Sequence, residues 1–188
     1  MKNIAIFASG NGSNAEAIAQ YFTGNKQVSI KCVLSNRQSA GVHQRIAAMN
    51  IPSLTFSKEE WNEAQKIVDF LHKEEIDFIV LAGFLAKIEK PIISAFNGRI
   101  VNIHPSLLPR YGGKGMWGHH IHEAVIAARE KQSGITIHYI DETIDGGGII
   151  FQATCDVLPN DTPDTLANRI HSLEHFHYPR VIEQLLAL

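Results

Sequence analysis

Residues 3–14 read NIAIFASGNGSN, and this stretch decides the fold class. Its first six residues form a mostly apolar run that is too short for a helix and typical of a buried strand. The glycines at 10 and 12 end that run, and from Ser13 onward the apolar residues fall at the three- and four-residue spacing of a helix. A strand that passes through a glycine loop into a helix is the beginning of a βαβ unit.

The same alternation of short apolar runs and helical spacing continues to about residue 103. Strands are predicted at 28–34, 77–82 and 100–103, and helices at about 40–49, 59–74 and 91–97. The strands are continuously apolar, which is typical of a parallel sheet that helices cover on both faces. In open parallel sheets, ligands bind beyond the carboxyl ends of the strands, so the long aperiodic stretch after the strand at 100–103 is where a site is expected.

The second half of the chain follows a different pattern. Strands are expected at 135–140 and 149–157, with only the loop 141–148 between them, a spacing that suits neighbouring antiparallel strands. A last helix is predicted to begin near 161–163, and Pro179 is expected to break it. The whole pattern predicts an α/β fold with a mostly parallel sheet and an antiparallel C-terminal part.

Length and charge exclude several classes of protein. The chain has 188 residues, the size of one domain, and its formal net charge is −2. Binding to nucleic acid or to a membrane surface therefore gains no electrostatic support, and no segment is apolar enough to span a bilayer. The two cysteines suit buried thiols in a reducing compartment, and no signal-peptide core precedes the first glycines, so a cytoplasmic location is expected.

A glycine-rich loop, Ser9–Asn14, joins the first strand to the first helix. Backbone N–H groups and the positive end of the helix dipole at such a junction favour a phosphate. The dinucleotide fingerprint is incomplete, because Ala15 replaces its third glycine and no acidic residue follows the strand at 28–34. The loop therefore predicts a site for a phosphate without the rest of a dinucleotide. The alternative is a glycine turn in which Ser13 and Asn14 only cap the helix.

Asn102 and His104 lie at the end of an expected interior strand, where alternation sends both side chains to the same side of the sheet. An amide can donate to an oxyanion and a histidine titrates near neutral pH, so the pair suits acyl-type transfer. Asp145, in a glycine-rich turn, can bring a carboxylate to the histidine and stabilise its protonated form. The alternatives are structural: an amide that satisfies loop backbone, a buried hydrogen-bonded histidine and an ordinary turn aspartate.

Ten histidines are the one compositional excess. Four of them invite a metal interpretation, namely His119, His120, His122 and His138. Their spacing matches no zinc signature, so substrate contacts or a solvated helix start are favoured and no metal is expected. On the last helix, His171, Glu174 and His175 share a face, which belongs either to the site or to solvent.

Five motifs, in this order along nearly the whole chain, resemble those of the folate-dependent formyltransferases. They are Ser9–Asn14, Leu81–Phe84, Asn102–Pro109, Ile144–Gly147 and Leu173–His175. The resemblance implies one Rossmann-like formyltransferase domain over 1–188, with a phosphate-binding half at about 1–100 and a catalytic and folate-binding half at about 101–188. It also implies that 10-formyltetrahydrofolate, a co-substrate, gives its formyl group to the amine of glycinamide ribonucleotide in purine biosynthesis, without a metal.

The resemblance also implies roles for individual residues. The catalytic trio of the family matches Asn102, His104 and Asp145. The residues that bind the phosphate and ribose of the acceptor match Gly12, Ser13, Asn14 and Glu174. The folate contacts fall on Leu85, Lys87, Ile88 and Asn102, in a segment with an apparent extra residue relative to the family pattern.

Two other classes of protein stay open as alternatives. One is a related folate enzyme, either a 10-formyltetrahydrofolate deformylase or a formyltransferase for another amine such as methionyl-tRNA. The length of the chain disfavours both, because those enzymes carry an additional domain. The other is a non-catalytic nucleotide-binding module, which would need the glycine loop but not the trio of polar residues. The expected partners are small molecules, and the chain is expected to be a monomer or a homodimer.

Overall fold

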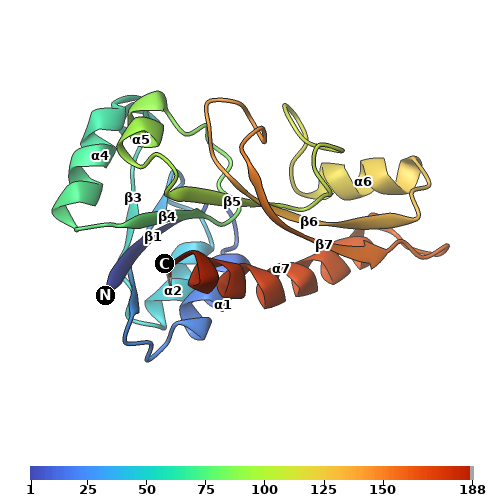
Figure 1. Ribbon diagram of the computed structural model, residues 1–188, viewed down its shortest axis with the longest axis horizontal. Coiled ribbons are helices and arrows are strands. Elements are labelled where there is room, and N and C mark those ends of the chain that lie inside the picture. Colours follow the sequence, from blue (N-terminus) through green and yellow to red (C-terminus); the bar gives the residue numbers. More distant parts are fainter. Residues whose placement is uncertain (187–188) are drawn as a thin grey trace.

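Seven strands cross the molecule side by side in the order β3-β2-β1-β4-β5-β6-β7 in the computed structural model, which describes residues 1–186 (Figure 1). The strands are β1 (Lys2–Phe7), β2 (Val28–Ser35), β3 (Ser53–Thr55), β4 (Phe78–Leu81), β5 (Ile100–His104), β6 (Gln132–Tyr139) and β7 (Ile149–Asp156). The first five pair in parallel, and β6 and β7 pair antiparallel to their neighbours. The predicted α/β class and its antiparallel C-terminal part are confirmed.

Helices cover both faces of this sheet. They are α1 (Ser13–Tyr21), α2 (Val42–Ala47), α3 (Lys58–Asn62), α4 (Ala64–Lys73), α5 (Lys90–Ala95), α6 (His119–Ala127) and α7 (Pro163–Leu186). Figure 1 shows α4 and α5 on one side of the strands and α1, α2 and α7 on the other. Among residues 1–186, no helix combines the length and the apolar character needed to cross a bilayer.

Alternating side chains of the strands pack into two separate hydrophobic cores. In β1, Ile4 and Ile6 join the core beneath α1, α2 and α7, whereas Ala5 and Phe7 join the core beneath α3, α4 and α5. All four side chains are fully buried. This two-sided burial is the reason that the strands of the parallel part read as continuous apolar runs.

Two local features differ from the prediction. The short edge strand β3 was not expected, because three residues carry too little periodicity to be recognised. The helix predicted at 59–74 is two helices: a capping box begins α3 at Ser57, and Glu63, with φ −87° and ψ 59°, separates α3 from α4.

The prediction that Pro179 breaks the last helix is wrong. Helix α7 continues to Leu186 with Pro179 buried inside it. A proline in a helix interior removes one backbone hydrogen bond and costs about 3 kcal/mol relative to alanine. Here the residues that follow it, Val181 and Ile182, are both buried in the core beneath α7, so packing outweighs that cost.

Candidate active site

A cleft of about 930 Å³ opens where β1, β4 and β5 end. Its walls come from the loops that follow those strands, from the segment 113–119, from the loop 140–145 and from one side of α7. Segments far apart in the sequence therefore meet at the edge where an open parallel sheet is expected to bind its ligand.

Strand β5 carries two polar side chains to this cleft. Val101 and Ile103 point into the core beneath α7, so Asn102 and His104, which alternate with them, point to the opposite face. Both line the cleft. In the antiparallel register with β6, Asn102 lies opposite His138 and His104 lies opposite Thr136.

His138 holds the amide of Asn102. Its Nδ1 lies 2.9 Å from the carbonyl oxygen of Tyr139, which can only accept, so Nδ1 carries the proton. Its Nε2 lies 3.2 Å from Nδ2 of Asn102 and accepts a hydrogen bond from that amide. Burial lowers the pKa of His138, which keeps the ring neutral and able to accept. One N–H of the Asn102 amide therefore stays free for a ligand in the cleft.

His104 is fixed in a similar way by a backbone carbonyl. Its side chain is almost fully buried, and its Nε2 lies 2.8 Å from the carbonyl oxygen of Tyr111. A carbonyl cannot donate, so Nε2 carries a proton in the neutral and in the charged ring. The other nitrogen, Nδ1, lies 3.7 Å from Oδ1 of Asp145. Nδ1 is therefore the atom of this ring that can gain or lose a proton.

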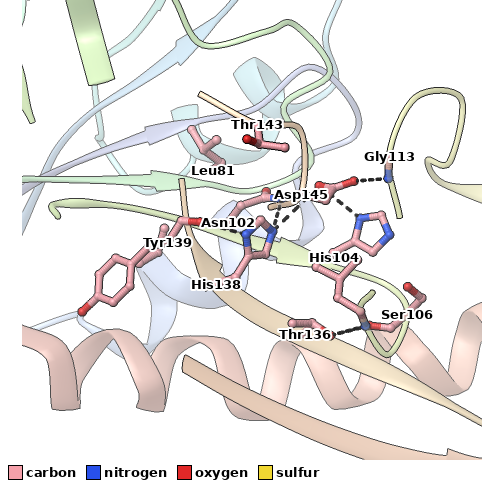
Figure 2. A network of polar contacts seen from close by, with 12 residues as sticks. Leu81, Asn102, His104, Ser106, Gly113, Thr136, His138, Tyr139, Thr143 and Asp145 are labelled. Atoms are coloured by element: carbon pink, nitrogen blue, oxygen red, sulfur yellow. Dashed lines mark hydrogen bonds and ion pairs between the residues drawn. The ribbon is translucent and has the colours of Figure 1, made fainter. Parts of the chain in front are cut away.

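Asp145 is the centre of the polar network in Figure 2. Its Oδ2 accepts a hydrogen bond from the backbone N–H of Gly113 at 2.9 Å, and its Oδ1 lies 3.9 Å from Nε2 of His138. The backbone at Asp145 is left-handed, with φ +54°. At Gly147, an added Cβ would lie 1.9 Å from the carbonyl oxygen of Tyr139, so only glycine lets the turn fold this closely against β6.

The glycine loop and the last helix form the opposite end of the cleft. Gly12 has φ +79°, and a Cβ there would meet the side chain of Val42 at 2.5 Å, so the loop lies directly on the start of α2. Asn14, in the first turn of α1, donates from Nδ2 to Oε2 of Glu174 on α7 at 2.9 Å. Burial raises the pKa of the Glu174 carboxyl to about 7, against a smaller effect of the bond from Asn14.

The third wall is the segment after β4, where the sequence predicts the folate contacts. Leu85, Lys87 and Ile88 all line the cleft. Leu85 is exposed, Ile88 is buried against the core beneath α4, and the backbone N–H of Leu85 donates to Oγ of Ser9 at 2.8 Å. This last bond ties the wall to the glycine loop.

The additional histidines surround the end of the cleft near α7. His119, His122 and His171 line it, whereas His120 does not. His122 is buried, and its pKa is lowered to about 4. Burial is the main cause, and the neighbouring His171 and His119 add to it. Within the described part of the chain, no three side chains of the metal-binding types gather as a metal site.

The sequence matches the family described as formyl transferase over residues 2–182. The chain belongs to the formyl transferase family. It is 41% identical to the phosphoribosylglycinamide formyltransferase of Bacillus subtilis (strain 168), in a match that covers 100% of this chain and 96% of that protein.

Solved structures agree with this family assignment. The phosphoribosylglycinamide formyltransferase of Bacillus halodurans superposes with a TM-score of 0.90 at 37% identity, covering 98% of this chain and 95% of that one. The enzyme of the same name from Streptococcus pneumoniae TIGR4 superposes with a TM-score of 0.88 at 35% identity, covering 98% and 99% of the two chains.

Every residue that the sequence assigned to the site of this formyl transferase lies at one cleft. The sequence did not identify three hydrogen bonds that organise the cleft. The Asn102 amide donates to His138, the backbone N–H of Gly113 donates to Asp145, and the Tyr111 carbonyl accepts from His104. Alternation along β6 could have placed His138 beside Asn102, because His138 and Thr136 share a face. The other two contacts are made by backbone groups and leave no signal in side-chain pattern.

Proposed function

We propose that this formyl transferase moves the formyl group of 10-formyltetrahydrofolate to the primary amine of glycinamide ribonucleotide. The products are formylglycinamide ribonucleotide and tetrahydrofolate, and the reaction is a step of purine biosynthesis. The observation that carries the proposal is the meeting, in one cleft, of a glycine loop at a helix N-terminus with the cluster of Asn102, His104 and Asp145. The names of the Bacillus subtilis relative and of the two solved structures support the same reaction.

The acceptor lies, in this proposal, along the end of the cleft between α1 and α7. The N-terminus of α1 leaves backbone N–H groups without helical partners, and these, with Gly12, Ser13 and Asn14, bind the phosphate. Glu174 borders the same region and offers carboxyl oxygens to the ribose hydroxyls. The glycinamide amine then extends toward His104.

The donor occupies the other end of the cleft in this proposal, beside Leu85, Lys87 and Ile88. These residues and Asn102 line the same cleft, so the formyl group of a folate on that wall can reach the amine. Holding both substrates in one orientation supplies much of the acceleration, because it converts a bimolecular step into one within a complex.

The bond changes follow from this arrangement. The neutral amine attacks the formyl carbon, and the formyl oxygen becomes an oxyanion. The free N–H of Asn102 and the protonated Nδ1 of His104 stabilise that charge, since His138 and the Tyr111 carbonyl hold both side chains in place beside the cleft. The carbon–nitrogen bond to the folate then breaks. The amine loses a proton and the folate nitrogen gains one, with Asp145 and a water molecule between them carrying it.

An acceptor-dependence assay tests this function. Purified protein is mixed with 10-formyltetrahydrofolate, and release of tetrahydrofolate is followed by absorbance with glycinamide ribonucleotide, with glycinamide, or with no acceptor. We expect release only with the ribonucleotide, because glycinamide lacks the phosphate that the glycine loop binds.

The other outcomes of the assay identify the alternatives. Release without any acceptor indicates a deformylase, and equal release with glycinamide indicates an enzyme that does not use the phosphate loop. Binding of the ribonucleotide with no release in any sample indicates a nucleotide-binding module.

The setting of the reaction belongs to the same proposal. Cys32 and Cys155 are free thiols, as expected for a protein of the reducing cytoplasm. The substrates are small molecules, neither a nucleic acid nor a membrane surface is required, and no metal takes part in the proposed steps. The residues assigned to the proposed steps all come from one chain, so this proposal suits a monomer or a homodimer.

A further inference from the structure

The backbone at Tyr111 has an unusual conformation for its residue type. Its φ is +55°, in the left-handed region that an aromatic residue adopts only when its surroundings fix it there. This conformation directs the Tyr111 carbonyl oxygen to Nε2 of His104 at 2.8 Å. The contact spans seven residues of a loop that has no regular secondary structure.

The side chain of Tyr111 is anchored away from the cleft. Its hydroxyl donates to Oε1 of Glu130 at 2.8 Å, and Glu130, which lies just before β6, also pairs with Arg110. The ring packs against the core beneath α7 and does not line the cleft. Tyr111 therefore touches the site only through its backbone.

Two acceptors compete for the single ring proton of a neutral His104. The Tyr111 carbonyl faces Nε2 at hydrogen-bond distance, whereas the carboxylate of Asp145 faces Nδ1 at 3.7 Å. His138 also borders Asp145, but its Nε2 accepts from Asn102 and offers no proton. If the carbonyl turned away, Nε2 would lose the acceptor that holds the ring in place, and the neutral ring would place its proton on Nδ1 toward Asp145 instead.

We propose that Tyr111 is a positioning residue for the formyl transfer: its hydroxyl, held by Glu130, keeps its carbonyl on Nε2 of His104 and reserves Nδ1 for the reactants. The role of Nδ1 in the reaction rests on the function proposed above. Which nitrogen of His104 carries the proton depends only on contacts within the unliganded protein. Arg110 pairs with the same Oε1 of Glu130, but its side chain is 60% exposed, so this ion pair is expected to contribute little.

Four substitutions around Glu130 test this. Tyr111→Phe removes the donor and Glu130→Ala removes the acceptor. Glu130→Gln keeps an acceptor oxygen, and Arg110→Gln removes the ion pair together with the guanidinium that lies 5.8 Å from the centre of the Tyr111 ring. Imidazole ¹⁵N resonances of the unliganded proteins report the tautomer of His104, which the spectrum of His104→Gln identifies. Kinetics with both substrates give kcat and the two KM values across pH.

We expect the first two variants to lose the exclusive Nε2–H form of His104, and Glu130→Gln and Arg110→Gln to retain it. In the first two, kcat falls about tenfold while both KM values stay within about twofold, because a His104 ring that is no longer held at Nε2 donates to the oxyanion from a less favourable position, which affects the transition state more than binding.

An unchanged tautomer and an unchanged kcat profile in Tyr111→Phe overturn the proposal. So does an equal loss in Arg110→Gln, which would indicate that the whole loop has become less ordered. If the wild-type protein transfers no formyl group, the proposed function fails, and the resonances of His104 still decide whether Tyr111 sets its tautomer.

Discussion

The two ring nitrogens of His104 have different partners, so only one of them is available to the reactants. The carbonyl of Tyr111 holds Nε2, and Nδ1 faces the carboxylate of Asp145 and the cleft. Alternation along β5 was enough to predict that Asn102 and His104 share a face. It could not predict which nitrogen is free, because that depends on a backbone group in a loop whose conformation the side chains alone do not specify.

Replacing His104 by alanine removes the donor to the oxyanion. We expect turnover to fall by at least about 10²-fold, the usual scale for a general acid or an oxyanion donor, with the circular dichroism spectrum unchanged. His120→Ala is the matched control, since that histidine is exposed and lies outside the cleft. Near-normal turnover in His104→Ala would remove this residue from the mechanism.

The buried carboxyl of Glu174 makes the stability of the protein depend on pH. Its pKa is about 7 in the folded chain against 4.5 in the unfolded chain, because burial disfavours the charged form. The unfolded state therefore releases its proton first as pH rises. Stability from this group is fully present below pH 4.5 and is lost as pH rises through 7, by about 3 kcal/mol in all.

Urea unfolding at several pH values checks this expectation. Glu174→Gln keeps an acceptor for Asn14 but cannot ionise, so its free energy of unfolding should rise relative to wild type between pH 5 and pH 8. Glu63→Gln, at an exposed ion pair on the surface, should show a constant difference from wild type over that range. A constant difference in Glu174→Gln as well would mean that the buried carboxyl does not change its charge there.

At the scale of secondary-structure elements, the turn between β6 and β7 determines where the carboxylate of Asp145 lies. It places Asp145 against His104 only because Gly147 fits close to β6. The two strands were predictable from their apolar residues, and so was a glycine-rich turn between them. The separate tasks of its glycines were not predictable, because they depend on the distance to backbone atoms of β6.

Two neighbouring substitutions separate these tasks. Gly147→Ala places a Cβ 1.9 Å from the Tyr139 carbonyl, so the turn must move and carry Asp145 with it, whereas a Cβ at Gly148 meets nothing within 4 Å. We expect kcat to fall at least tenfold in Gly147→Ala, since small displacements of positioned groups cost that much or more. Gly148→Ala should behave as wild type in the same assay, and equal activities would show that the position of the turn is unimportant.

At the scale of the whole molecule, the proposed acceptor site joins the first helix to the last. Asn14 of α1 and Glu174 of α7 share a hydrogen bond, and Tyr21 and Glu183 connect the same two helices further along. The sequence predicted both helices and the polar residues on each. Local patterns could not predict that they meet, because the two residues are 160 positions apart; only the resemblance to the formyltransferases placed both at one acceptor site.

Ligand binding should therefore stabilise the entire fold in one cooperative transition. Glycinamide ribonucleotide at about 100 times its dissociation constant should raise the free energy of unfolding by about 2.7 kcal/mol, as expected for a ligand that binds only the folded state. Asn14→Ala at the same ligand concentration should show a smaller gain. Thermal unfolding followed by both tryptophan fluorescence and circular dichroism measures this, and two separate transitions would contradict the expected coupling.

The contact between Asn14 and Glu174 also determines when the acceptor site can form during protein synthesis. On a ribosome that adds about 5–20 residues per second, the glycine loop is made about 8 to 32 seconds before its carboxyl partner, because 160 residues separate the two. A nascent chain can assemble β1 and α1 early, yet it has no complete acceptor site until α7 has emerged. Any help that the metabolite gives to folding in the cell is thus reserved for chains from which α7 has already emerged.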